Sequence, residues 1–129
     1  MHRSGKSQGY PAPHPDPKVD AFRPYIEKAV TALKEAGLTV IESWMDPCDP
    51  IDATIRLGGW ALVWDEWDGW RLGVFVSGRQ GVRTVLHDTV RFEGGPRLAV
   101  VELAQRVRDF TRGSVEQITG AALAEAAVR

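Results

Sequence analysis

The sequence contains few of the residues that build metal centres, disulfides and active sites. Cys48 is the one cysteine among 129 residues, and three histidines are present. A single cysteine excludes both an internal disulfide and a cysteine-based metal cluster within one chain. The sequence contains no phosphate loop, zinc signature, dinucleotide fingerprint or nucleophile motif. His87 is the one histidine in the part of the chain that is expected to fold. The sequence therefore predicts a non-enzyme with no catalytic residue, metal or cofactor.

Long apolar runs and an excess of one charge are also missing. No run approaches the length that crosses a bilayer, and the first residues lack the apolar core of a secretory signal. We therefore expect a cytoplasmic protein without membrane contact. The formal net charge of −1 argues against nucleic-acid binding by bulk electrostatics. The charges are uneven, however: residues 38–70 carry seven acids and one arginine, whereas residues 71–112 carry eight arginines and four acids.

Residues 51–81 predict consecutive antiparallel strands. Gly58-Gly59 suits a tight hairpin turn, and residues 65–69 can close a second hairpin. These turns pair Leu57 with Trp60, and then Trp64 with Trp70, so both hairpins place one apolar set on the same face. That set is Ile55, Leu57, Trp60, Leu62, Trp64, Trp70, Leu72, Val74 and Val76.

A third turn over residues 77–81 predicts a further strand over residues 82–92. In this register Arg71 faces His87 and Phe75 faces Arg83. Residues 82–92 are rich in β-branched residues, although their apolar positions also fit one face of a helix.

Helices are predicted on both sides of these strands. Apolar residues recur at helical spacing from Val19 to Ala36, and Pro24 places the start of the helix between residues 20 and 23. Residues 38–45 read as a first strand, and the segment that follows Gly94-Gly95-Pro96 reads as a helix through Phe110. The predicted fold is α+β, in two layers: a five-stranded antiparallel meander with an N-terminal helix and one or two C-terminal helices.

The chain is expected to form one domain with a segment at each end. Residues 1–17 carry proline at every second position from Pro11 to Pro17, which predicts a disordered tail outside the core. Residues 18–113 form the predicted α+β domain. Ser114 to Gln117 has the spacing of a capping box, so residues 114–129 are predicted to be an amphipathic helical segment.

The candidate binding residues lie mainly on the reverse face of the predicted sheet, opposite the apolar set. That face mixes aromatic and arginine side chains, a combination that can stack on ligands or partner side chains. Cover by the terminal helix or by a second copy of the chain is the alternative for this face. Trp67, at a hairpin tip, and Arg79, in a glycine turn, add two exposed candidates. The full set is Trp44, Trp67, Arg71, Phe75, Arg79, Arg83 and His87.

Asp46, Asp49 and Asp52 recur at every third residue and offer oxygen ligands for a hard cation. The spacing is not that of an EF-hand loop, so turns shaped by aspartate side chains are the favoured interpretation. Cys48 lies in this acidic loop and is expected to have no lowered pKa.

Four segments resemble a known family: DPIDATIRL at 49–57, ALVWDE at 61–66, GWRLG at 69–73 and FVSGRQGVR at 75–83. They are similar to a family of small actinobacterial proteins of unknown function, and the likeness covers residues 19–110. The resemblance implies a bacterial cytoplasmic protein. It supplies no catalytic residue or ligand.

Three functions are compatible with these observations. The leading hypothesis is a non-catalytic module that binds a protein partner or forms a homodimer through the candidate surfaces. The alternative is a nucleic-acid-binding or regulatory domain in which arginines contact phosphates and Phe75 or Trp44 stacks on a base. A small enzyme or ligand carrier comes third and requires an enclosed pocket that joins His87 to an acid.

Overall fold

The computed structural model describes residues 8–113, which fold into a helical layer and a curled sheet. A 3-10 helix, η1, leads into a C-terminal helix over residues 100–113. The other elements, in chain order, are α1 (Pro17–Asp20), α2 (Arg23–Glu35), β1 (Glu42–Asp46), β2 (Asp52–Leu57), β3 (Trp60–Asp65), β4 (Gly69–Arg79) and β5 (Val82–Arg91), followed by η1 (Gly95–Arg97). The strands form a meander in the order β1-β2-β3-β4-β5. The predicted α+β class is confirmed.

The predicted pairing of β2 with β3 and of β3 with β4 is confirmed in register. Leu57 pairs with Trp60 across the glycine turn, and Trp64 pairs with Trp70 across the second hairpin. Gly58, at φ +79°, supplies a left-handed turn residue. Five members of the predicted apolar set are buried on one face of the sheet: Ile55, Leu62, Trp64, Trp70 and Leu72.

The predicted pairing of β4 with β5 is wrong, although the fifth strand itself exists. Arg71 pairs with Arg91, and Phe75 pairs with Leu86 rather than with Arg83. The connecting turn is only Gln80-Gly81, because β4 extends through Arg79 and Gly81 takes φ +88°. The pairing of β4 with β5 also shifts register at three points, and each shift changes which residues pair beyond it.

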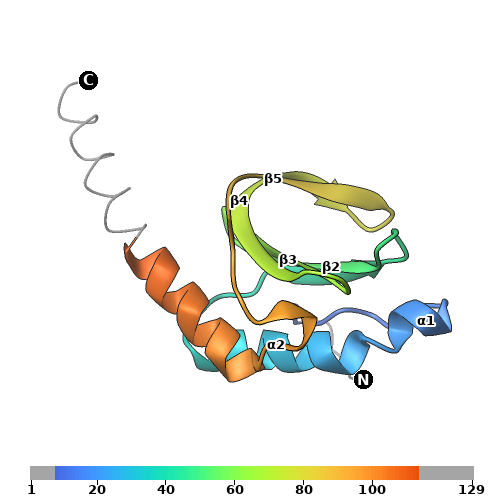
Figure 1. The fold of residues 1–129 in the computed structure, drawn as a ribbon, viewed down its shortest axis with the longest axis horizontal. Coiled ribbons are helices and arrows are strands. Elements are labelled where there is room, and N and C mark those ends of the chain that lie inside the picture. The colour runs from blue at the N-terminus through green and yellow to red at the C-terminus, as the bar shows by residue number, and fades with distance from the viewer. Residues whose placement is uncertain (1–7, 114–129) are drawn as a thin grey trace.

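The sheet curls so strongly that β5 folds back over the reverse face (Figure 1). Thr54 of β2 and Thr84 of β5 share a hydrogen bond of 2.6 Å, although β3 and β4 separate their strands in the sheet. At the end of the hairpin, Gln80 donates from Nε2 to the carbonyl oxygen of Met45 on β1. The reverse face is thus a concave interior covered by the chain's own β5, and neither a terminal helix nor a second copy is needed to cover it.

The helical layer packs against the other, apolar face of the sheet (Figure 1). Ile26 and Leu33 of α2, with Leu103 and Val107 of the C-terminal helix, belong to one core with the strand residues. Tyr25 donates its hydroxyl hydrogen to the carbonyl oxygen of Leu98 and accepts a hydrogen bond of 3.0 Å from Nε1 of Trp70. The predicted helices at both ends of the sheet are confirmed.

Residues 8–17 differ from the predicted detached tail, because they pack against the domain. Gly9 is buried, and its carbonyl oxygen accepts a hydrogen bond of 2.5 Å from Ser43. Tyr10 packs on the core and shares a hydrogen bond of 2.8 Å with Thr31. The proline spacing did not reveal the contacts that hold this segment. Residues 1–7 and the predicted terminal segment 114–129 lie outside the described residues.

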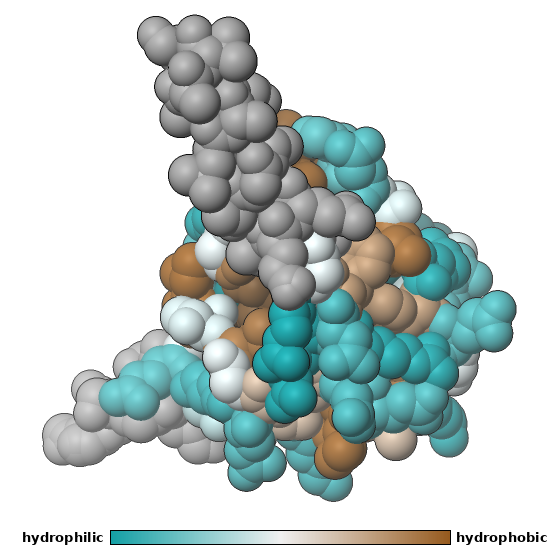
Figure 2. Space-filling view, turned by 90° about the vertical axis from the view of Figure 1, so that its left-hand side faces the viewer, coloured by the Kyte–Doolittle hydropathy of each residue, from teal (hydrophilic) through white to brown (hydrophobic). Residues whose placement is uncertain are grey.

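The face on which the C-terminal helix lies shows hydrophobic patches separated by hydrophilic side chains (Figure 2).

Among the described helices, none combines the length and the apolarity that crossing a bilayer requires.

Candidate interaction surfaces

Three aspartates lie in one row across neighbouring strands at the end of the concave face. Asp46 of β1 pairs with Asp52 of β2, which pairs with Asp65 of β3. All three are buried. We call them the aspartate row. Sequence reasoning grouped Asp46 and Asp52 with Asp49, but it missed Asp65, which the confirmed β2–β3 register places opposite Asp52.

Two members of the aspartate row hold turns in place. Asp46 accepts a hydrogen bond of 2.6 Å from the backbone N–H of Gly81, so it anchors the end of the β4–β5 hairpin. Asp65 accepts hydrogen bonds from the backbone N–H groups of Trp67 and Asp68 and shapes the β3–β4 turn. No group of metal-ligating side chains with suitable geometry occurs within residues 8–113. Asp46 and Asp65 therefore stabilise the two turns that they contact.

The third member, Asp52, carries the clearest electrostatic perturbation. Burial, followed by the negative charge of Asp46, raises the pKa of Asp52 from 3.8 to about 6. Arg83 offsets part of this effect, since its Nη1 lies 3.8 Å from the Asp52 carboxylate. Burial also raises the pKa of the Cys48 thiol, which agrees with the expectation that this cysteine has no lowered pKa.

Arg71 lies half-buried beside the aspartate row. Its Nη1 is 3.8 Å from the Asp65 carboxylate. Burial, and next the charge of Arg91, lowers the pKa of Arg71. Arg71 therefore compensates buried carboxylates, and its side chain is only partly accessible to a partner.

The two aromatic candidates of the reverse face are not free to stack on a ligand. Trp44 is buried, and its indole Nε1 has no hydrogen-bond partner among the residues that the structure describes. Phe75 is half-buried, with the guanidinium carbon of Arg56 lying 4.1 Å from its ring centroid. The predicted face is correct, but β5 and Arg56 cover its aromatic groups.

The remaining candidates lie at separate places on the surface. Trp67 is 61% exposed at the β3–β4 turn, as predicted. Arg79 is exposed at the end of β4, and Arg83 is exposed on β5. His87 pairs with Val74 instead of Arg71, and its Nδ1 lies 3.0 Å from the Asp88 carboxylate on the exposed surface.

His87 and Asp88 contact each other, although successive residues of a regular strand point to opposite faces of the sheet. Asp88 adopts φ +55°, which breaks the alternation of side chains along β5. Both side chains are exposed, so the contact does not form the enclosed site that a catalytic His–Asp arrangement would need.

Sequence reasoning missed an apolar surface on the β4–β5 hairpin. Val76, Val82 and Val85 are 53%, 41% and 48% exposed. Val76 was predicted to pack with the helical layer, but the curl and the register shift after Phe75 carry this part of the hairpin away from the helices (Figure 1). We call Val76, Arg79, Val82 and Val85 the hairpin surface. The mixture of apolar and basic residues in the segment 76–85 was the feature of the sequence that could have indicated this surface.

The fold is that of a small α+β domain with a curled antiparallel sheet. Residues 25–112 match the model of a protein family, DUF6292, which is described as a family of unknown function. The chain belongs to this family, in agreement with the resemblance of its strand segments. Neither the curated proteins nor the solved structures give a match.

Proposed function

We propose that the chain is a non-catalytic protein-interaction module whose hairpin surface receives an extended, acidic segment of a partner protein. The observation that carries the proposal is the group of three exposed valines on one hairpin at the edge of the sheet. Exposed apolar side chains that gather on one element can mark an interaction site.

The edge position of β5 supplies the backbone part of such an interface. Among the described strands β5 pairs only with β4, so its other edge keeps backbone donors and acceptors available. An extended peptide can add to such an edge through main-chain hydrogen bonds, while pockets or patches for alternate side chains give specificity. The register break at Asp88 limits regular addition to the part of β5 that precedes it.

The charge of the hairpin indicates the chemistry of the partner. Residues 69–91 contain four arginines, Arg71, Arg79, Arg83 and Arg91, and one acid, Asp88. This surplus favours a segment in which acidic residues alternate with apolar ones. It also disfavours pairing between the hairpins of two copies, because both would bring the same positive charge.

The nucleic-acid alternative loses the stacking contacts on which it was based. Trp44 is buried and Phe75 lies under Arg56, so neither presents a free ring to a base. The exposed arginines are the feature that this alternative retains, and they fit an acidic protein segment equally well.

Selection from a displayed random-peptide library tests the proposal with the full chain as bait. We expect enriched peptides that alternate acidic and apolar residues and whose affinity falls about tenfold with Val85→Thr or Arg79→Glu. Ile41→Ser is the matched control, since Ile41 is an exposed apolar residue before the opposite edge strand. Peptides that bind the hairpin variants and the control equally would overturn the proposal. Tighter, salt-sensitive binding of a single-stranded oligonucleotide that requires Arg79 would replace it with the nucleic-acid alternative.

A further inference from the structure

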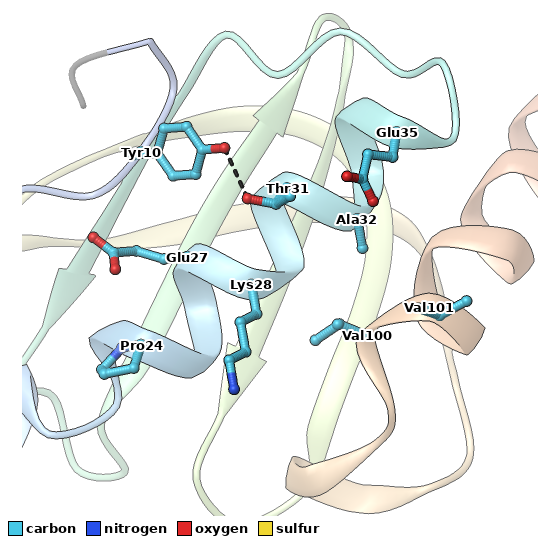
Figure 3. Close-up of a pocket in the computed structure, with 9 residues that line it drawn as sticks. All are labelled: Tyr10, Pro24, Glu27, Lys28, Thr31, Ala32, Glu35, Val100 and Val101. Atoms are coloured by element: carbon cyan, nitrogen blue, oxygen red, sulfur yellow. Dashed lines mark hydrogen bonds between the residues drawn. The ribbon is translucent and has the colours of Figure 1, made fainter. Parts of the chain in front are cut away.

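A long hollow runs along the outer surface of the helical layer, between α2 and the C-terminal helix. Its larger part has a volume of about 750 Å³ and is lined by Tyr10, Pro24, Glu27, Lys28, Thr31, Ala32, Glu35, Val100 and Val101 (Figure 3). A second hollow of about 210 Å³ shares Ala32, Glu35 and Val101 with the first. We call the combined feature the helical trough.

The helical trough exposes apolar surface. Val101 lies in its wall and is 71% exposed, the largest exposure among the bulky apolar side chains that the structure describes. Val100 and Ala32 line the floor beside it (Figure 3). An apolar hollow between two helices is the shape into which a helix of a partner packs.

The charges beside this floor are arranged symmetrically about small residues. Lys28 and Glu35 lie on α2, seven positions apart, with Thr31 and Ala32 between them. Seven positions are about two helical turns, so both charged side chains lie along the same side of α2. Within residues 8–113, no hydrogen bond or ion pair joins the side chain of Lys28 or of Glu35 to another residue.

We propose that the helical trough is the interface of a homodimer in which α2 of one copy packs antiparallel on α2 of a second copy. A two-fold axis between Thr31 and Ala32 brings Lys28 of each copy opposite Glu35 of the other. The small residues at the centre allow the helices to approach closely, and Val101 is covered by the second copy. The two charge contacts are reciprocal, so this surface is complementary to itself in a way that the positively charged hairpin surface is not.

Charge reversal tests this arrangement in the full chain, with solution mass measured by light scattering across a concentration series. Wild-type protein is expected to form dimers. Lys28→Glu places two acidic side chains opposite one another in both symmetric contacts, and Glu35→Lys does the same with two lysines. Each variant should weaken the dimer at least about tenfold. The double variant Lys28→Glu/Glu35→Lys restores opposite charges and is expected to restore the dimer to within about threefold.

This rescue separates the interface from a general effect on folding. The two positions are too far apart on α2 to form a pair within one copy, so the double variant regains nothing inside a monomer. Val101→Ser should also weaken the dimer, whereas Val85→Thr on the hairpin surface should leave it unchanged. A monomer at every concentration would overturn the proposal, as would a dimer that the single variants leave intact or that the double variant fails to restore.

Discussion

Thr54 and Thr84 meet across the concave face of the sheet, where their Oγ1 atoms lie 2.6 Å apart. Their strands, β2 and β5, have two other strands between them in the sheet order. Both side chains are buried, so each hydroxyl depends on the other as a partner. The pair therefore reports directly on the closure of the hairpin over the reverse face.

Replacing Thr54 with valine should destabilise the domain by about 1–3 kcal/mol, because the buried hydroxyl of Thr84 loses its partner. The double variant Thr54→Val/Thr84→Val should lose less than the sum of the two single variants, since no orphan hydroxyl remains. Urea unfolding followed by tryptophan fluorescence measures all four free energies of unfolding. Strict additivity would show that the pair is not formed in solution.

The registers of β2, β3 and β4 could be predicted because two short turns constrain them independently. The turn at Gly58-Gly59 and the turn ending at Gly69 place the same residues of β3 on one face, and a slip of either would bury polar side chains. The pairing of β5 could not be predicted in the same way. One of its three register shifts lies at Asp88, which has a positive φ, and alternation of apolar residues does not reveal such a backbone conformation in advance.

The candidate surfaces were predictable only as far as the strand faces were. Trp44 was assigned to the correct face, but its burial depends on β5 folding over that face, which is a tertiary effect. Asp65 was overlooked as a member of the aspartate row, although the confirmed β2–β3 register places it opposite Asp52. The helical trough depends on how α2 and the C-terminal helix are rotated about their axes, and helical spacing alone does not fix that packing.

Gly73 tests how tightly β5 lies against β4. A Cβ atom at this position would lie 2.9 Å from Cγ2 of Thr89 and 3.0 Å from Cβ of Leu86. Gly73→Ala should therefore cost about 1–3 kcal/mol of stability, measured by urea unfolding. Gly59→Ala is the matched control, because a Cβ there meets no atom within 4 Å and we expect a change within about 0.5 kcal/mol. Equal effects at the two glycines would contradict the close approach of β5.

Tyr25 connects the helical layer to the sheet through its hydroxyl group. Tyr25→Phe removes the acceptor of Trp70 Nε1 and the donor to the Leu98 carbonyl oxygen, both in the part-buried core. We expect a loss of about 1–3 kcal/mol in the free energy of unfolding. Tyr10→Phe serves as the control, since the Tyr10 hydroxyl bonds with Thr31 in an exposed position and its loss should cost about 0.5 kcal/mol or less. A loss at Tyr25 no larger than at Tyr10 would count against this connection.

Asp52 should make stability depend on pH in a direction opposite to that of most paired carboxylates. Its pKa is about 6 in the folded protein, because burial and the charge of Asp46 disfavour the ionised form. The ordinary value for an unfolded aspartate is about 4, so the folded state binds more protons between about pH 4 and pH 6. The contribution of Asp52 to stability therefore falls as pH rises through this window, and above it the destabilisation is fully present.

Asp52→Asn removes this dependence, because asparagine stays neutral at every pH in the range. The variant should gain on the order of 1–2 kcal/mol relative to wild type at pH 7.5, after allowance for solvent screening at this end of the sheet, and the gain should shrink toward pH 4. Urea unfolding at closely spaced pH values measures the difference, with Asp49→Asn in the same loop as an exposed control. A difference between variant and wild type that stays constant from pH 4 to pH 7.5 would rule out Asp52 as the titrating group. A gain that grows between about pH 4 and pH 6 and levels off above that range would identify the buried Asp52 carboxylate as a destabilising group.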